Sequence, residues 1–404
     1  MNEMEKKEIF LKESEKVLKK LKGESGIALI IHHDDADGIC SGAIAAKMLE
    51  MLGLKYHVVC VEKVFPEVIK LIDETKVDFF VFTDIGSGAA SKISKMITGD
   101  RSIYIMDHHD AERVEDPRLT HFNPELFGLS GEVIASGATV TYLVARNLGE
   151  DAKKLAWMAV VGAAEIPGRL DHFNWLAFQD AQEVGDVERT VTPRGESIRV
   201  KVFRKPISYK SLNTSLTILG SVGYYRDGPQ LALSACFFRD LSEAEKEIKK
   251  LEKERKEKFD KVMERIKEDG LFALRNVQWF DVEDEFKNMG TKTIGTFTSK
   301  LRFKLRLIHG KKYILGFMNM SNIIPGLGEI KGRWKKVSVR VPFKFEELIH
   351  AGSKQPVSAL IVAAAYHNGG YGDGHDIAGS GVVPYENKQS FIEMFESLAA
   401  EKPK

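Results

Sequence analysis

The stretch IALIIHHDDADG, residues 27–38, joins an apolar run to a cluster of two histidines and three aspartates. Residues 27–32 have the length and composition of a buried strand, and residues 38–51 have helical spacing. Three carboxylates within four residues repel one another unless a cation or a basic partner compensates them; a solvated acidic turn is the alternative. Mixed imidazole and carboxylate ligands suit manganese or a similar divalent ion better than calcium, which prefers oxygen ligands alone.

Two further expected strands end in the same kinds of side chain. Residues 78–83 lead directly into Asp84, and residues 102–106 lead into the tripeptide DHH at positions 107–109. Together with a strand over residues 55–62 and the helical stretches between them, the pattern predicts an α/β fold with a parallel sheet. The carboxyl ends of parallel strands meet at one edge, where open α/β sheets build their ligand sites. We therefore predict a metal site at this edge.

The number of candidate ligands predicts two divalent metal ions, with manganese as the best fit. Two such ions would activate water and stabilise the phosphoryl oxygens during an in-line attack. One carboxylate must then bridge the ions, and either Asp37 or Asp84 could do so. His109 could contact the scissile phosphate instead of a metal.

The length and one charged stretch predict two domains. A chain of 404 residues exceeds the size at which a single hydrophobic core stops growing. Residues 242–270 carry a narrow apolar stripe among many charges, which predicts one long helix; a surface helix or a coiled-coil arm is the alternative. We expect a catalytic domain over residues 1–240, a connector helix over 241–270 and a substrate domain over 271–404.

Basic residues are concentrated in the second expected domain. Residues 300–344 contain twelve Lys or Arg residues and a single acid, although the net charge of the whole chain is +1. Within residues 300–307 the cations alternate with apolar residues, which predicts a strand with four cations on one face and its apolar side toward a core. Such a face fits a nucleic-acid backbone, and a solvated sheet face is the alternative interpretation.

Several of these motifs resemble those of a known family. Asp35-Ala36-Asp37-Gly38, Asp84 and Asp107-His108-His109 are similar to the first three motifs of the DHH phosphoesterase superfamily. In the second domain, Ser338-Val339-Arg340 and Gly374-His375 resemble the phosphate-contacting motifs of the DHH-associated substrate domain. The amino-acid sequence of the first motif is most similar to that of archaeal RecJ-like nucleases. The resemblance implies a parallel-sheet DHH domain joined by a long helix to a smaller, mixed-sheet α/β domain.

The resemblance also implies roles for individual residues. The expected metal ligands are His33, Asp35, Asp37, Asp84, His108 and Glu165, and the expected catalytic residues are Asp107 and His109. The expected substrate contacts are Ser338, Arg340, Gly374 and His375, to which the basic run adds Arg302 and Lys304. One departure concerns the fourth metal-binding acid, because the aspartate that the family places after a Val-Gly-Ala turn is absent here. Glu165 or Asp171 could replace it.

The function implied is a manganese-dependent exonuclease that hydrolyses single-stranded DNA or RNA in replication or repair. The alternatives are a phosphodiesterase for short oligonucleotides or cyclic dinucleotides, and a weakly active or non-catalytic replication scaffold. Expected partners are single-stranded nucleic acid and a replisome or fork-repair protein, and a homo-oligomer is left open. No apolar run approaches the roughly eighteen residues that span a bilayer, and no secretory signal is evident, so we expect a cytoplasmic protein.

Overall fold

The computed structural model of the chain describes residues 2–166, 168–193 and 195–401. These residues divide into two compact units. The first comprises Met1–Lys249 with Ile324–Gly328, and the second comprises Lys250–Ile323 with Glu329–Lys404. The boundary after Lys249 lies within the 28-residue helix α11 (Ser242–Asp269), so this one helix contributes to both units.

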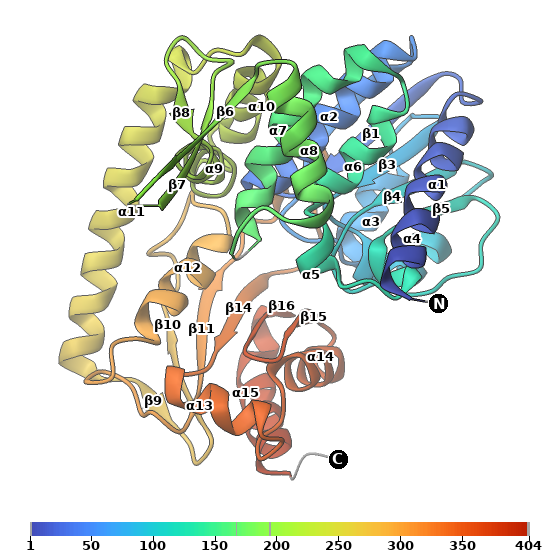
Figure 1. Ribbon diagram of the computed structural model, residues 1–404. Coiled ribbons are helices and arrows are strands. Elements are labelled where there is room, and N and C mark those ends of the chain that lie inside the picture. Colours follow the sequence, from blue (N-terminus) through green and yellow to red (C-terminus); the bar gives the residue numbers. More distant parts are fainter. Residues whose placement is uncertain (1, 167, 194, 402–404) are drawn as a thin grey trace. The chain divides into compact units, whose positions relative to one another are not determined.

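A five-stranded parallel sheet forms the centre of the first unit (Figure 1). Its strand order is β2-β1-β3-β4-β5, and every neighbouring pair is parallel. The strands are β1 (Ile27–His32), β2 (Lys55–Cys60), β3 (Phe79–Thr83), β4 (Ser102–Met106) and β5 (Leu119–Phe122). The α/β fold with a parallel sheet is thus confirmed. The sequence prediction missed β5, which is only four residues long and only partly buried, and so lacks a strong apolar signal.

The direction in which strands are added to the sheet reverses between β1 and β3. The chain leaves β1 toward β2 on one side and later continues from β3 toward β4 on the other side. In open α/β sheets, ligand sites lie at the carboxyl ends of the strands where this reversal occurs. Residues that directly follow these two strands are therefore brought together.

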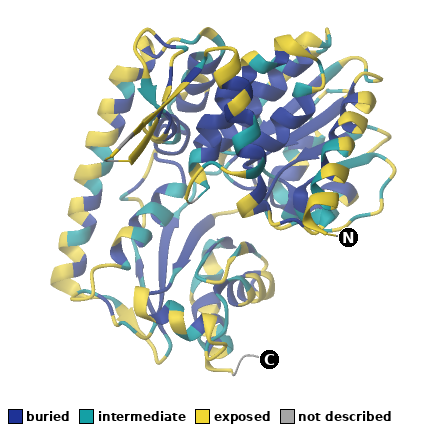
Figure 2. Ribbon diagram, viewed as in Figure 1, coloured by how far each residue is buried: buried dark blue, intermediate teal, exposed yellow. Residues whose placement is uncertain are grey.

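Helices surround this sheet and complete the first unit. Helices α2, α6 and α7 pack on one another, and α2 is buried over most of its length because its small side chains allow close packing (Figure 2). The helices are α1 (Glu3–Leu21), α2 (Ala36–Met51), α3 (Pro66–Asp73), α4 (Ala90–Met96), α5 (Gly131–Ile134), α6 (Gly137–Arg146), α7 (Ala156–Gly162), α8 (His172–Glu183), α9 (Tyr209–Thr217) and α10 (Gly228–Phe238). A small antiparallel sheet that the sequence did not predict consists of β6 (Val187–Thr192), β7 (Gly195–Val200) and β8 (Ile207–Ser208).

The second unit is built on a six-stranded mixed sheet of order β15-β16-β14-β11-β10-β9. Only the β10–β11 pair is parallel among its described pairs. Its elements are β9 (Phe272–Ala273), β10 (Val277–Asp281), α12 (Lys292–Leu301), β11 (Tyr313–Asn319), β14 (Trp334–Arg340), α13 (Phe343–His350), α14 (Val357–His367), β15 (Tyr371–His375), β16 (Ala378–Pro384) and α15 (Lys388–Ala400). A separate short pair consists of β12 (Ile323–Ile324) and β13 (Gly328–Glu329), of which Ile324–Gly328 belong to the first unit.

Alternation along β11 shows how this sheet buries both of its faces. Tyr313, Leu315 and Phe317 belong to one hydrophobic cluster together with residues of α13, α14 and α15. Ile314 and Met318 belong to a second cluster, formed with α12 and the end of α11. Successive side chains of a strand point to opposite faces, so helices on both sides are needed to cover the sheet.

The expected basic strand over residues 300–307 is wrong. Lys300 lies in α12, whose buried residues Ile294, Phe297, Thr298 and Leu301 recur at helical spacing. Tight turns follow the helix up to residue 307. Two of the apolar partners do not face a core, because Phe303 is 62% exposed and Leu305 is 54% exposed. A helical period of apolar residues upstream of residue 300 therefore overrides the local alternation.

Candidate functional site

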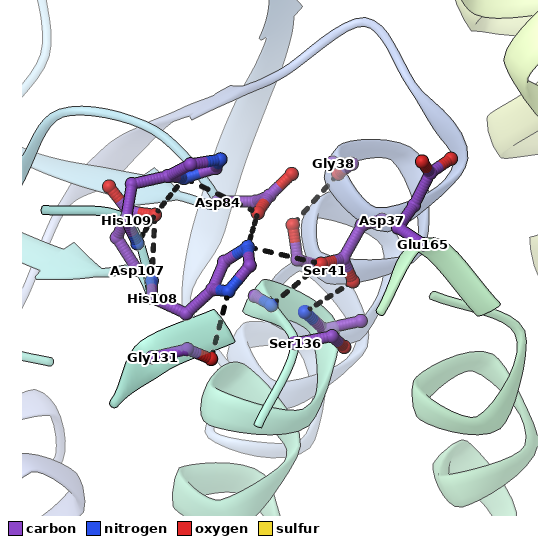
Figure 3. A network of polar contacts seen from close by, with 12 residues as sticks. Asp37, Gly38, Ser41, Asp84, Asp107, His108, His109, Gly131, Ser136 and Glu165 are labelled. Atoms are coloured by element: carbon purple, nitrogen blue, oxygen red, sulfur yellow. Dashed lines mark hydrogen bonds and ion pairs between the residues drawn. The ribbon is translucent and has the colours of Figure 1, made fainter. Parts of the chain in front are cut away.

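Five side chains from three strand ends lie close together at one edge of the parallel sheet of the first unit. Figure 3 shows three of them, Asp84, His108 and His109. His33, Asp35 and Asp84 form one triplet of ligand atoms, all within 4.8 Å of one another. Asp84, His108 and His109 form a second triplet that meets the same limit. Asp84 belongs to both triplets, so it is the carboxylate that two ions could share.

The backbone holds Asp84 in an unusual conformation. Its φ angle is +57°, in the left-handed region that residues other than glycine rarely adopt. Its amide donates to the Met106 carbonyl at 2.9 Å, which extends the β3–β4 pairing by one residue. The side chain is only 1% exposed. Such strain at a buried carboxylate is typical of a functional position.

Asp35 and His33 complete the first triplet at the start of α2. One Asp35 oxygen accepts a hydrogen bond from the Gly38 amide at 3.0 Å and so caps the helix. The other Asp35 oxygen lies 2.8 Å from His33 Nδ1. The neighbouring Asp34, 1% exposed, lies 3.1 Å from His33 Nε2. These two aspartates are thus packed around one imidazole.

Asp37 lies beside the second triplet but is tied to the backbone. Its two oxygens accept hydrogen bonds from the Gly137 and Ala138 amides at 2.7 and 2.8 Å, at the start of α6. One of them is also 3.7 Å from His108 Nε2. A helix N-terminus stabilises a carboxylate in this position. Asp37 is therefore a weaker candidate for a metal ligand than Asp84.

The DHH tripeptide is held by hydrogen bonds on both sides. His108 Nδ1 lies 3.2 Å from the Gly131 carbonyl, which directs Nε2 toward Asp84 at 3.4 Å. Burial, with the charge of His109, lowers the pKa of His108 and favours the neutral imidazole that binds metals. Asp107 accepts from His109 Nδ1 at 2.7 Å. Burial alone raises the pKa of Asp107, but the charge and hydrogen bond of His109 outweigh it, so the pKa lies well below its usual range.

The chemistry of these donors fits hard divalent cations. Asp34, Asp35, Asp37, Asp84 and Asp107 are all buried within this one site. Taking several carboxylates out of water is costly unless a cation or hydrogen-bond donors compensate them. Two imidazole-carboxylate triplets that share one carboxylate match the ligand types of manganese or a similar ion.

The sequence of residues 27–163, which contains all of these donors, matches the family described as "DHH family, N-terminal domain". The first unit therefore contains a DHH domain. The chain is also 28% identical to an uncharacterized protein of Methanocaldococcus jannaschii, over 97% of this chain and 98% of the relative.

Solved structures show the same fold over nearly the whole chain. RecJ of Thermus thermophilus in complex with Mn²⁺ superposes with a TM-score of 0.63 at 15% identity; it covers 98% of this chain, which spans only 55% of the Thermus protein. An exonuclease RecJ bound to manganese gives 0.60 at 16% identity, with 97% and 95% covered. CDC45 from Entamoeba histolytica gives 0.59 at 12% identity, with 97% and 99% covered. The chain thus has a RecJ-like DHH fold, as expected from its motifs.

Glu165 is not part of either ligand triplet. It is exposed, at the end of a short 3-10 helix, and accepts a hydrogen bond from the Thr217 hydroxyl at 3.2 Å. Figure 3 draws it on the far side of Asp37 from the histidines. The other candidate, Asp171, caps α8 by accepting from the His172 amide. Neither acid is placed with the five clustered side chains.

We therefore expect Glu165→Ala to change the rate of metal-dependent hydrolysis by no more than about threefold. Substitutions of exposed residues typically shift free energies by about 0.5 kcal/mol, which is about two- to threefold in rate. Initial rates on a labelled oligonucleotide would measure this, with Asp84→Asn as the comparison. A loss with Glu165→Ala as large as that with Asp84→Asn would show that Glu165 does serve as the fourth acid.

The second unit gathers its predicted substrate residues at one end of its sheet. Ser338 and Arg340 lie on β14, and Gly374 and His375 lie on β15, joined through β16. Arg340 pairs with Ala378, which in turn pairs with His375, so the three residues lie in one row across the strands. Gly374 has a φ of +153°, and an added Cβ would lie 2.4 Å from the Cα of Gly379. The glycine is needed for close packing of two strands.

Arg340 is the main cation of this row and lies at one end of it. Its guanidinium donates to the hydroxyls of Ser299 and Ser338 at 2.9 and 3.1 Å and to the Gly379 carbonyl at 3.2 Å. Burial lowers the pKa of Arg340 to about 10, and the charge of nearby Arg302 acts in the same direction. A partly buried arginine held by hydroxyls and a carbonyl, without a carboxylate among these partners, is suited to bind an anion.

The two remaining predicted contacts differ from each other. Arg302 forms an ion pair with Glu346 and lies close to Arg340. Lys304 is exposed in the turns after α12. The alternation of residues 300–307 predicted that Arg302 and Lys304 lie side by side on one strand face. The structure does not place them so.

Two positioning residues were not among the predicted site residues. Ser87 donates its amide to Asp107 at 3.0 Å. Asn123 donates its side-chain amide to the Ser87 hydroxyl and to the His109 carbonyl, both at 2.8 Å. The signal in the sequence is their position: Ser87 comes shortly after an expected strand, and Asn123 directly follows β5, which was not predicted. Their hydrogen bonds explain how the DHH tripeptide is oriented.

Proposed function

We propose that this protein is a metal-dependent phosphodiesterase that hydrolyses single-stranded DNA or RNA from an end, with manganese as its cofactor. The observation that carries the proposal is Asp84, a buried carboxylate shared by two triplets of potential ligands. Sites for two adjacent ions are typical of enzymes that displace one oxygen of a phosphate by another. The fold shared with RecJ proteins, two of them crystallised with manganese, supports the same class of reaction.

The roles of the residues follow from their contacts. Bound divalent ions would supply an activated water and charge stabilisation of the phosphate. The proposed ligands are His33, Asp35, Asp84 and His108, with Asp37 beside them. The Asp107 carboxylate can only accept, so it keeps a proton on His109 Nδ1 and orients Nε2, which we assign to contact the scissile phosphate.

The second unit would hold a phosphate of the substrate. Ser338, Arg340, Gly374 and His375 are the proposed contacts, since they lie together at one end of the sheet. Arginine presents several N–H donors in a planar fork that matches phosphate oxygens. A role in replication or repair is part of this proposal, and the likeness to the fold of CDC45 is compatible with it.

A second candidate is a phosphodiesterase for short oligonucleotides. It is favoured by the finding that residues 300–307 do not form the expected cationic strand, because a short substrate needs less backbone contact. Cleavage of a dinucleotide without cleavage of a long strand would support this candidate.

The decisive experiment is digestion of end-labelled single-stranded DNA and RNA with and without Mn²⁺, by the native chain and by Asp107→Ala. We expect cleavage by the native protein only with the metal, and a decrease of about a hundredfold or more in the variant, because His109 is no longer oriented. Gel analysis of product length would separate exonuclease from dinucleotide activity. Equal cleavage by the variant would assign the activity to another site or to a contaminant.

A further inference from the structure

The turns after α12 expose large apolar side chains among cations. Phe303 and Leu305 are 62% and 54% exposed, and both are flanked by the exposed cations Lys304 and Arg306. At the start of α13, Phe343 is 60% exposed and is followed by the exposed Lys344. Exposed apolar groups gathered with charges of one sign mark interaction sites. We call Phe303, Lys304, Leu305, Arg306, Phe343 and Lys344 the aromatic-basic surface.

The exposure of Phe303 and Leu305 is built into the fold. Leu301 before them and Ile308 after them are buried in the same hydrophobic cluster. Between these anchors, the Lys304 amide donates to the Leu301 carbonyl at 2.8 Å and the Leu307 amide donates to the Lys304 carbonyl at 2.7 Å. Consecutive hydrogen-bonded turns therefore present the side chains outward from a fixed base.

An ion pair connects the two parts of the surface. Arg302 pairs with Glu346, which lies one helical turn after Phe343 on α13. The same guanidinium is 5.1 Å from the centroid of the Phe303 ring, a cation-π distance. Arg302 thus contacts Phe303 directly and is linked through Glu346 to the helix that carries Phe343. Its own charge is compensated by Glu346.

The charge of the surface selects its partner. Lys304, Arg306 and Lys344 contribute three cations, against one exposed acid of α13, Glu347, while Glu346 is engaged by Arg302. Phosphates complement the cations, and unpaired bases can stack on the phenylalanine rings; this combination of groups is characteristic of proteins that bind single strands. Arg302 also neighbours Arg340, the proposed phosphate contact, so the surface adjoins that site within the same unit.

We propose that the aromatic-basic surface binds the unpaired bases and backbone of a single-stranded nucleic acid next to the phosphate held at Arg340. This inference rests on the proposed function and extends it from the cleaved end to the strand that follows. The alternation of residues 300–307 predicted that Phe303 and Leu305 face a core. The inference instead assigns nucleic-acid binding to these side chains. A long strand would use this surface, whereas a dinucleotide would not need it.

The test is equilibrium binding of fluorescein-labelled oligothymidylate and oligouridylate to the full chain in EDTA, followed by fluorescence anisotropy. We expect the double variant Phe303→Ala/Phe343→Ala to lower the affinity by about tenfold for each ring removed. Lys304→Gln/Arg306→Gln should reduce the slope of log affinity against log salt by about 0.7 for each phosphate that the variant no longer neutralises. Tyr366→Ala, which removes a 78% exposed aromatic residue of α14, is the matched control and should bind as the native chain does.

Native affinity in the Phe303→Ala/Phe343→Ala variant would overturn the inference, as would an equal decrease with Tyr366→Ala. Light scattering on the same samples tests whether a second copy of the chain occupies the surface instead. A native dimer that dissociates in the double variant, with oligonucleotide affinity unchanged, would assign the surface to that second copy. Because binding is measured without metal, its outcome is separate from hydrolysis. Failure of the proposed function would appear instead as no Mn²⁺-dependent cleavage of any substrate.

Discussion

Asp84→Asn is expected to lower Mn²⁺-dependent hydrolysis of single-stranded DNA by about a thousandfold or more. The substitution keeps the size of the side chain but removes the one charge that both ligand triplets share. Asparagine also tolerates the positive φ at this position, so the backbone should be retained. Initial rates at saturating metal, measured on end-labelled strands, give the size of the effect.

Although Asp84→Asn should lower activity, it should increase the stability of the protein when no metal is present. Removing one of several buried carboxylates relieves their mutual repulsion, so the melting temperature of the metal-free variant should rise. Added Mn²⁺ stabilises the native chain by about 2.7 kcal/mol at a hundred times its dissociation constant, and this gain should disappear in the variant. Asp110→Asn is the matched control, because Asp110 is exposed just beyond the DHH tripeptide. Native activity with Asp84→Asn would refute a bridging role.

Gly137→Ala is expected to reduce hydrolysis by about a hundredfold or more and to destabilise the fold. A Cβ at this position would lie 2.2 Å from an Asp84 oxygen and 2.5 Å from the Asp84 Cβ, too close for either group to remain in place. Displacing a reacting group by about 1 Å can cost about a hundredfold in rate. The Gly137 amide also donates to Asp37, so movement of the helix start would disturb both carboxylates.

The decrease in stability for Gly137→Ala should be about 1–3 kcal/mol, the usual range for overpacking a buried site. Thermal unfolding followed by circular dichroism measures it. Gly310→Ala is the control, since an added Cβ at Gly310 meets no atom within 4 Å. If Gly137→Ala keeps both native activity and native melting temperature, the close approach of α6 to Asp84 is not required.

The strands and the order of the motifs could be read from the sequence. Three expected strands end in Asp35-Ala36-Asp37, Asp84 and the DHH tripeptide, and the structure brings residues of all three together. Strands of four to six buried apolar residues carry a strong local signal, so β1, β3 and β4 could be placed to within one residue. The roles assigned to individual residues stay predictions until variants are measured.

Among the described helices, none combines the length and the apolar character that crossing a bilayer requires. This agrees with the sequence, in which apolar runs are short.

Local alternation misled where tertiary packing decided the outcome. In residues 300–307, alternating cations and apolar residues suit a strand, yet Leu301 completes the buried stripe of α12 and the next residues turn outward. The cost of exposing Phe303 and Leu305 is outweighed by burial of the helix and of Ile308 in one cluster. Such a choice depends on contacts of α12 with β14 and on the cluster it shares with α11, both of which are distant in sequence.

The sequence by itself determined that acids and imidazoles follow successive parallel strands, because strand period and strand ends are local properties. Only the tertiary structure decided that Asp84 is shared by two ligand triplets, that Asp37 is held by the α6 amides, and that Glu165 lies outside both triplets. The physical reason is that hydrogen bonds and ion contacts depend on distances of a few ångströms between residues far apart in the chain.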